Sequence, residues 1–273
     1  MPLSDYLAQA RKKHLTVGFV PTMGALHNGH LALIEACKKE NNIAVCSIFV
    51  NPTQFNNPSD FTHYPNAVEH DIEQLVQADC PVLFLPGKEE IYPEPFHARH
   101  YDLGYLETIL EGRYRPGHFQ GVCQAVDRLL SIVNPDILYL GQKDYQQCLV
   151  IKKLLYLTGK QHIQIKIIPT IREASGLAMS SRNLRLSEAH RKNATAIYKA
   201  LSFLKTHAAS KPFAALCKEA GVYLERSGFT VDYVAIADAE NLSFLEEAGN
   251  RKAVGLIAAT IGGIRLIDNM LLN

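Results

Sequence analysis

The sequence lacks a strong excess of charge of either sign. Its 273 residues include 28 Lys and Arg against 27 Asp and Glu, which gives a formal net charge of +1. A chain so close to neutral has no overall field that would attract nucleic acid or an anionic membrane. Any site for an anionic ligand must therefore be built locally, from a small number of residues.

Long apolar runs and paired cysteines are also missing. No apolar run reaches the roughly 18 residues that a membrane-spanning helix needs. The opening residues, MPLSD, do not show the charged and then apolar pattern of a signal peptide. The six cysteines form no C-x-x-C pair, and most lie within apolar segments. We therefore expect buried thiols in a reducing compartment, and a cytoplasmic protein.

What the chain does contain is an alternation of strand and helix patterns. Apolar residues make up 47% and charged residues 20%, as in soluble globular proteins. Strands are predicted at residues 16–20, 43–50, 81–85, 136–140 and 163–168, and helices at 31–40, 67–78, 119–133 and 145–157. The run IAVCSIFV at 43–50 does not alternate, which is typical of a strand buried on both faces. We predict an α/β fold with a doubly wound parallel sheet.

The pattern changes after about residue 187. Helices are predicted at 188–207 and 213–226, followed by strands at 231–237, 253–261 and 264–272. The pair Gly262-Gly263 between the last two strands is a strong hairpin signal. These elements predict a second, smaller α+β C-terminal domain. We place the boundary between residues 178 and 179.

The first polar motif, PTMGALHNGH at 21–30, lies between the first strand and the first long helix. Ligands of parallel sheets bind at loops that follow the strands, and a helix N-terminus offers N–H groups and partial positive charge to phosphate. His27 and His30 are three residues apart, so both rings could donate hydrogen bonds to phosphate oxygens. The alternatives are an ordinary loop and a metal site, but the motif supplies no third metal ligand.

Three further polar motifs follow later strands. The run MSSRN at 179–183 offers hydroxyls and a guanidinium to a triphosphate. In GQKD at 141–144, Lys143 provides a point charge, and Asp144 either caps the next helix or holds Mg²⁺ with phosphates. In NPTQF at 51–55, the Gln54 amide suits a ligand with hydroxyl and carboxylate groups. The segment RYRPGH at 113–118 is either a solvated loop or part of the anion site.

In this order and on these loops, the motifs resemble the pantothenate synthetase family, a member of the H-x-G-H nucleotidyltransferases. The matching blocks are P-T-M-G-A-L-H-N-G-H, F-V-N-P-T-Q-F, G-Q-K-D-Y-Q-Q and A-M-S-S-R-N. The resemblance is strong over residues 20–185 and rests on domain pattern elsewhere. It implies a Rossmann-like ATP- and pantoate-binding domain at 1–178 and a small lid domain at 179–273. It also implies a homodimer, with no nucleic acid or membrane as partner.

The reaction implied by the resemblance has two steps. Pantoate attacks the α-phosphate of ATP to give pantoyl adenylate and pyrophosphate, and β-alanine then displaces AMP. His30, His27 and Lys143 would be catalytic, Gln54 and Gln147 would bind substrate, and Asp144 would hold Mg²⁺. The ATP site would comprise Met23, Gly24, Ala25, Leu26, His27, Asn28, Gly29, His30, Gly141, Gln142, Lys143, Asp144, Ile171, Met179, Ser180, Ser181 and Arg182.

One residue departs from the family pattern, and rival functions stay open. The family usually reads G-E-K-D, whereas this chain has Gln142 in place of the acid. The first rival is another H-x-G-H nucleotidyltransferase that acts on a phosphate substrate. A tRNA synthetase would need a basic anticodon-binding domain, which is not evident here. A non-catalytic nucleotide-binding or electron-transfer module would leave polar motifs on four separate loops unexplained.

Overall fold

The computed structural model describes residues 2–56, 58–65, 67–247 and 249–273. These residues form two compact units. The first contains the described residues up to Gly141 together with Val150–Pro169, and the second contains Gln142–Leu149 and the described residues from Thr170 onward. The predicted boundary at 178–179 with a C-terminal lid stays a prediction, because compactness does not measure which segment moves.

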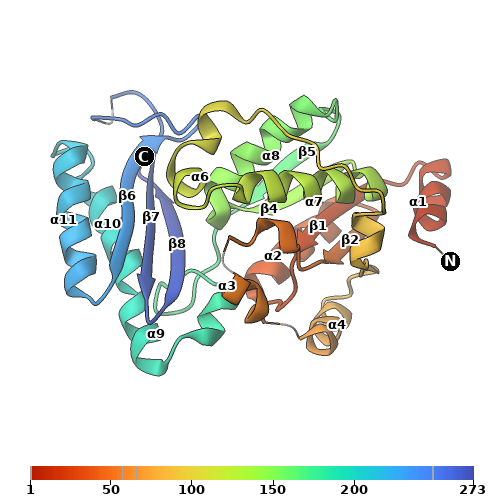
Figure 1. Cartoon of the computed structure of the whole chain (residues 1–273), viewed down its shortest axis with the longest axis horizontal. Coiled ribbons are helices and arrows are strands. Elements are labelled where there is room, and N and C mark those ends of the chain that lie inside the picture. The colour runs from red at the N-terminus through yellow and green to blue at the C-terminus, as the bar shows by residue number, and fades with distance from the viewer. Residues whose placement is uncertain (1, 57, 66, 248) are drawn as a thin grey trace. The chain divides into compact units, whose positions relative to one another are not determined.

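The first unit contains a parallel sheet of five strands (Figure 1). Its order is β3 (Val82–Phe84), β2 (Ile43–Ile48), β1 (Val17–Thr22), β4 (Ile137–Gly141) and β5 (Gln164–Ile168). Val17 lies opposite Ile43, and Ile137 lies opposite Gln164. The chain builds outward from β1 in one direction and then in the other, so a ligand crevice is expected at the ends of β1 and β4. The predicted fold class is confirmed.

Strand β1 continues two residues beyond the predicted end at Val20. Pro21 has no N–H to donate, and the sequence predicts that the loop begins there. In the structure it pairs with Ser47 of β2 on one side, whereas β4 pairs with β1 only at Gly18 and Phe19. The missing N–H therefore interrupts no ladder, and the polar loop begins one residue after Thr22.

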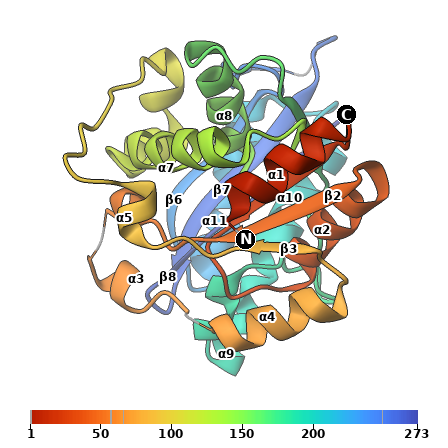
Figure 2. The same cartoon turned by 90° about the vertical axis from the view of Figure 1, so that its right-hand side faces the viewer.

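Helices cover both faces of this sheet (Figure 2). Helices α2 (Asn28–Glu40) and α4 (Val68–Gln77) lie on one side, and α1 (Leu3–Lys12) and α7 (His118–Val133) lie on the other. Ile34 and Cys37 of α2 share a buried cluster with Leu75 of α4. This shared core fixes α4 beside the start of α2. The shorter elements are η1 (Pro52–Gln54), α3 (Pro58–Thr62), α5 (Lys88–Ile91), η2 (Gly104–Glu107) and α6 (Leu110–Tyr114).

Helix α1 was not anticipated from the sequence. Only Leu7 and Ala10 are buried in it, so its apolar stripe is short. A long-range contact anchors it, because Arg11 donates hydrogen bonds to the carbonyls of Val133 and Asn134 at 2.6 and 3.1 Å. Those carbonyls end α7, where a cation is favourable.

The second unit is an antiparallel sheet of β6 (Thr230–Asp238), β7 (Ala253–Ile261) and β8 (Ile264–Leu271) (Figure 1). Helices α10 (Ala196–His207) and α11 (Phe213–Arg226) pack on it through one apolar cluster. The hairpin at Gly262-Gly263 is confirmed, with φ of +56° and +76°. The other elements of this unit are η3 (Gln142–Asp144), η4 (Ser181–Arg185) and α9 (Glu188–Ala194). Helix α8 (Tyr145–Leu157) begins in this unit, and its residues from Val150 belong to the first.

The helix predicted at 188–207 is in fact two helices. The first, α9, ends at Ala194, and α10 begins at Ala196. Thr195 lies between them, and its hydroxyl donates to the carbonyl of Lys192 at 2.8 Å. A Thr side chain that bonds the preceding turn competes with the helical ladder, which explains the interruption.

All six cysteines are free thiols, and four of them are buried. Burial raises the pKa of Cys37, Cys123 and Cys148 to about 12 and that of Cys217 to about 11. Thiols that stay protonated at neutral pH are poor nucleophiles. The predicted burial is thus confirmed for Cys37, Cys46, Cys123 and Cys148. The four thiols with these raised pKa values are poorly suited to nucleophilic catalysis. Among the described residues, no helix has the length and apolar character to cross a membrane.

Candidate active site

The loop after β1 takes an unusual backbone conformation. Gly24 and Ala25 have φ of +81° and +47°, so two successive residues are left-handed. A left-handed conformation costs a non-glycine residue roughly 1–2 kcal/mol. Thr22 helps to set this turn, because its hydroxyl donates to the Ser47 carbonyl at 2.7 Å and accepts from the Gly24 N–H at 3.2 Å. The loop is therefore held by specific bonds.

The two histidines of the motif lie together at the start of α2. Their rings stack with centroids 4.0 Å apart and planes at 24°. His27 is the N-cap of the helix, and its Nδ1 accepts the N–H of Gly29 at 3.1 Å. A ring nitrogen that accepts carries no proton, so the neutral ring of His27 holds its proton on Nε2. The predicted proximity of His27 and His30 is thus present, with Nε2–H of His27 as the donor.

The N–H groups of this helix start are partly taken. Gly29 donates to His27, and the N–H groups of His30 and Leu31 donate to the His27 carbonyl at 2.8 and 3.1 Å. The backbone N–H groups predicted to bind phosphate are therefore bonded within the turn at residues 29–31, and donation by the two imidazole rings stays a prediction.

Two side chains of helix α4 hold the loop that follows β1 by hydrogen bonds. The carboxylate of Asp71 accepts the N–H groups of Ala25 and Leu26 at 2.8 and 2.7 Å, and Gln74 donates to the Leu26 carbonyl at 3.2 Å. Sequence reasoning did not single out Asp71. The available signal was a charge on the apolar stripe of an amphipathic helix, one turn before Leu75.

Gln54 lies next to the loop that follows β1. Its Nε2 lies 3.0 Å from Sδ of Met23, and its Oε1 accepts from Nδ2 of Asn51 at 3.0 Å. Asn51 is itself 2% exposed and accepts the Tyr92 hydroxyl at 2.7 Å. The amide of Gln54 is thus oriented before any ligand binds. The first unit therefore brings together the predicted residues 23–30 and Gln54.

The segment 113–118, left undecided from the sequence, braces Gln54. His118 is buried, and its Nδ1 donates to the Gln54 carbonyl at 2.8 Å. Its Nε2 faces Arg115 at 3.0 Å, and Arg115 lies 3.6 Å from Glu111. A Cβ on Gly121 would sit 2.2 Å from the Thr53 carbonyl, so only glycine allows η1 this close to α7.

In the second unit, strand β8 holds the turn at 142–144. Asn269 is 2% exposed, and its Nδ2 donates to the carbonyls of Gln142 and Lys143 at 2.9 and 2.8 Å. These bonds turn Oδ1 of Asn269 toward Gln142, whose Nε2 lies 3.3 Å away. A carboxylate at position 142 cannot donate this bond. Gln142 in place of the usual acid therefore suits the orientation of Asn269 in this chain.

Because the motifs predict that this turn belongs to an ATP site, we expect Asn269→Asp to raise the KM for ATP by about tenfold. The new carboxylate would face two carbonyl oxygens that Asn269 now satisfies, and one such lost pairing costs about 1–3 kcal/mol. Steady-state AMP release at varied ATP measures the effect. The matched control is Asn273→Asp, because Asn273 also donates its amide to a carbonyl, that of Arg251 at 2.8 Å. Equal KM values in the two variants would contradict this role of Asn269.

An ion pair ties the loop at 171–179 to the same strand. Arg172 donates to both oxygens of Asp268 at 2.6 and 3.1 Å and to the Asn269 carbonyl at 3.2 Å. Burial raises the pKa of Asp268, and the charge-assisted bonds from Arg172 oppose that shift. Arg172 also donates to the Gly176 carbonyl at 3.1 Å, which closes the turn before Met179.

The predicted triphosphate loop is the start of η4. The hydroxyl of Ser180 caps this turn by accepting the N–H of Arg182 at 3.3 Å. Asn183 anchors it from within, with Nδ2 bonded to the Ala178 carbonyl at 3.0 Å. Met179 pairs with Ile171 through a backbone bond of 3.0 Å.

Lys143 and Asp144 lie side by side in η3, with Nζ and Oδ1 3.8 Å apart. Gln147 follows within α8 and is half-buried. Within the described residues, no three His, Cys, Asp or Glu side chains are arranged to hold a metal ion. The second unit thus gathers Gln142, Lys143, Asp144, Ile171, Met179, Ser180, Ser181 and Arg182 near β8, whereas Gly141 ends β4 of the first unit. That both sets line one nucleotide cleft stays a prediction.

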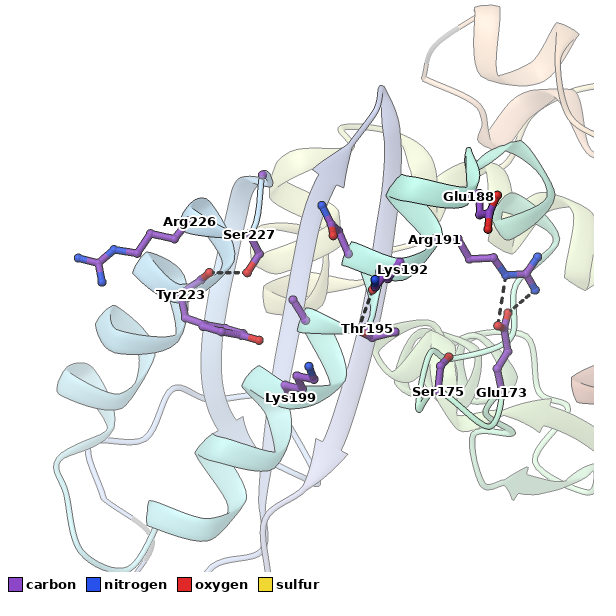
Figure 3. A pocket seen from close by; sticks show the side chains of 13 residues that line it. Glu173, Ser175, Glu188, Arg191, Lys192, Thr195, Lys199, Tyr223, Arg226 and Ser227 are labelled. Atoms are coloured by element: carbon purple, nitrogen blue, oxygen red, sulfur yellow. Dashed lines mark hydrogen bonds and ion pairs between the residues drawn. The ribbon is translucent and has the colours of Figure 1, made fainter.

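A separate pocket of about 900 Å³ lies on the second unit (Figure 3). It is open to solvent, and its wall carries both signs of charge, including the ion pair of Arg191 with Glu173 at 2.8 Å. None of the predicted site residues lines it.

Comparisons with known proteins agree with the motifs. A family model described as pantoate-beta-alanine ligase matches residues 2–271. A relative named pantothenate synthetase from Cytophaga hutchinsonii is 45% identical over 273 residues, which is 98% of this chain and 95% of the relative. Another from Moorella thermoacetica is 43% identical over 276 residues, with the same coverage.

Solved structures that resemble this chain carry the same family names. The crystal structure of pantothenate synthetase from Thermus thermophilus superposes with a TM-score of 0.90 at 41% identity, covering 97% of each chain. That of pantoate-beta-alanine ligase from Francisella tularensis, complexed with beta-gamma ATP and beta-alanine, gives a TM-score of 0.83 at 39% identity. It covers 99% of this chain and 95% of the other.

Proposed function

Because this chain belongs to the pantoate–β-alanine ligase family, we propose that it condenses pantoate with β-alanine at the expense of ATP. It is an acid–amine ligase that forms AMP. A pantoate carboxylate oxygen attacks the α-phosphate and pyrophosphate leaves, which gives pantoyl adenylate. The amine of β-alanine then attacks the acyl carbon, the acyl–oxygen bond breaks, and pantothenate and AMP are released.

Neither step needs a nucleophile from the protein, so the side chains act by alignment and charge neutralisation. His27 and His30 donate to phosphate oxygens as pyrophosphate leaves. Lys143 adds a positive charge to the same phosphates, and Arg182 with the hydroxyls of Ser180 and Ser181 completes the ATP contacts. Gln54 holds pantoate and β-alanine, and Gln147 holds pantoate.

Mg²⁺ is proposed as the metal that accompanies ATP. Mg²⁺ usually keeps several waters and binds through one or two carboxylates plus substrate phosphates. Asp144 is the candidate carboxylate, because its side chain is about half exposed and directly follows Lys143, which we propose to meet the same phosphates. The absence of a three-ligand cluster among the described side chains agrees with a metal held mainly by the nucleotide. When bound, the metal would neutralise phosphate charge.

A homodimer and a cytoplasmic location are proposed as well. Both rest on the family resemblance and, for the location, on the free buried thiols. We further propose that the second domain closes over ATP and excludes water from the adenylate.

The observation that carries the proposal is the approach of Gln54 to Met23, because it places an oriented amide for a carboxylate substrate beside the loop expected to hold ATP. The test supplies pantoate, ATP and Mg²⁺ with and without β-alanine. We expect pyrophosphate in both cases and pantothenate with AMP only when β-alanine is present. A product that retains the nucleotide would instead identify a nucleotidyltransferase acting on another acceptor.

A further inference from the structure

The carboxylate of Asp71 lies directly beneath the loop that follows β1. Asp71 is 1% exposed and comes from the first turn of α4. Its Oδ2 accepts the N–H of Ala25 and its Oδ1 accepts the N–H of Leu26. We propose that Asp71 is a positioning residue, which holds residues 23–27 in the conformation that presents Met23 and His27 to ATP. This inference rests on the proposed function.

The backbone conformation of the loop requires support from Asp71. We call the two hydrogen bonds that Asp71 accepts from Ala25 and Leu26 the clamp. Ala25 has φ of +47°, a conformation that an alanine rarely adopts without support. The left-handed stretch at Gly24 and Ala25 turns the N–H groups of Ala25 and Leu26 toward α4. Asp71 binds both of them and thereby selects this conformation over the extended alternatives.

The fit leaves no spare room around the clamp. A Cβ added to Gly24 would lie 2.9 Å from Oδ2 of Asp71 and 3.1 Å from Cγ2 of Ile48. The carboxylate also sits in the first turn of α4, where the helix dipole favours a negative charge. Both its oxygens act as acceptors, a role that an amide fills at only one of its two atoms.

The clamp also determines which hydrogen-bonding groups of the loop can contact the nucleotide. The N–H groups of Ala25 and Leu26 are bound to Asp71, and that of Gly24 is bound to Thr22. They are therefore not offered to phosphate. The loop contributes its shape and its side chains, and its shape depends on a residue 46 positions further along the chain.

Asp71→Asn tests the proposal in the full-length enzyme. The substitution keeps the size of the side chain but turns an NH₂ group toward one of the two N–H groups. We expect the KM for ATP to rise about tenfold, with the KM for β-alanine changed less than twofold, because one N–H loses its acceptor. Adding Ala25→Gly should recover at least half of the loss on a logarithmic scale, because glycine adopts the left-handed conformation freely.

The control is Asp136→Asn, which removes a carboxylate that accepts the Val17 N–H at 2.7 Å, at the other end of β1. It should lower the melting temperature without changing the KM for ATP. If Asp71→Asn does not fold, Asp71→Ser supplies the same KM comparison. An unchanged KM for ATP, or a loss that Ala25→Gly does not reduce, would overturn the proposal.

A second readout separates this inference from the proposed function. The dissociation constant of ATP, measured by calorimetry, should rise with the KM in Asp71→Asn. If the wild-type chain makes no pantothenate but binds ATP, and Asp71→Asn weakens that binding tenfold, the reaction assignment fails and the clamp stands. If the wild-type protein and Asp71→Asn bind ATP equally, the proposed role of Asp71 is wrong, whichever reaction the protein catalyses.

Discussion

His30→Ala is expected to slow formation of the adenylate by about 10²–10⁴-fold, the range for a positioned acid or a preorganised donor. The His30 ring lies in the first turn of α2, stacked 4.0 Å from that of His27. It therefore adds a donor beside the Nε2–H of His27, where negative charge grows on departing pyrophosphate. Single-turnover release of pyrophosphate from ATP and pantoate, without β-alanine, isolates this step.

The fold should not depend on His30, since the helix is capped by His27. His70→Ala is the matched control, because His70 is an exposed histidine of the same unit that pairs with Glu73 at 3.6 Å. It should leave pyrophosphate release unchanged, and both variants should keep the wild-type circular dichroism spectrum. Near-normal adenylation by His30→Ala would remove His30 from the mechanism.

Lys143→Ala is expected to lower kcat/KM for ATP by about 10²–10³-fold, the usual loss for one preorganised electrostatic contact. The Lys143 side chain is only 18% exposed, and Asn269 fixes its backbone carbonyl. The ammonium group is therefore held in place before ATP arrives. Lys143→Arg should restore only part of the rate, because a planar guanidinium differs in shape from an ammonium.

Lys199→Ala serves as the control for the charge itself. Lys199 belongs to the same unit but lines the open pocket of Figure 3. Its removal changes the net charge equally and should leave kcat/KM for ATP within twofold. If the two alanine variants lose the same activity, a diffuse charge effect, and not a placed ammonium, is responsible.

Much of the fold follows from local patterns. The apolar run predicted as a strand at 43–50 is a fully buried strand over Ile43–Ile48, two residues shorter than predicted, and the Gly262-Gly263 signal marks a real hairpin. Local chemistry also placed His27 and His30 at a helix start. These features depend on residues that are close in sequence, so periodicity and turn chemistry suffice to predict them.

What the sequence did not reveal depends on distant partners. Asn269 holds the turn at Lys143 across 126 residues, and His118 braces Gln54 across 64. His118 follows Arg115 by three residues, and this local sequence would be the same in a solvated loop and in a buried contact. Only the packing of α7 against η1, which Gly121 permits, distinguishes the two cases.

The hydrogen bonds from Asn269 to the turn at 142–144 also affect the order in which the protein folds during synthesis by the ribosome. The carbonyls of Gln142 and Lys143 accept from an asparagine that is translated 127 and 126 residues later. The parallel sheet can form earlier, since domains generally fold in the order in which they emerge. In a nascent chain, His27 and His30 would thus be in place long before Asn269 can fix the turn that carries Lys143. The chain would therefore become able to use ATP only late in translation.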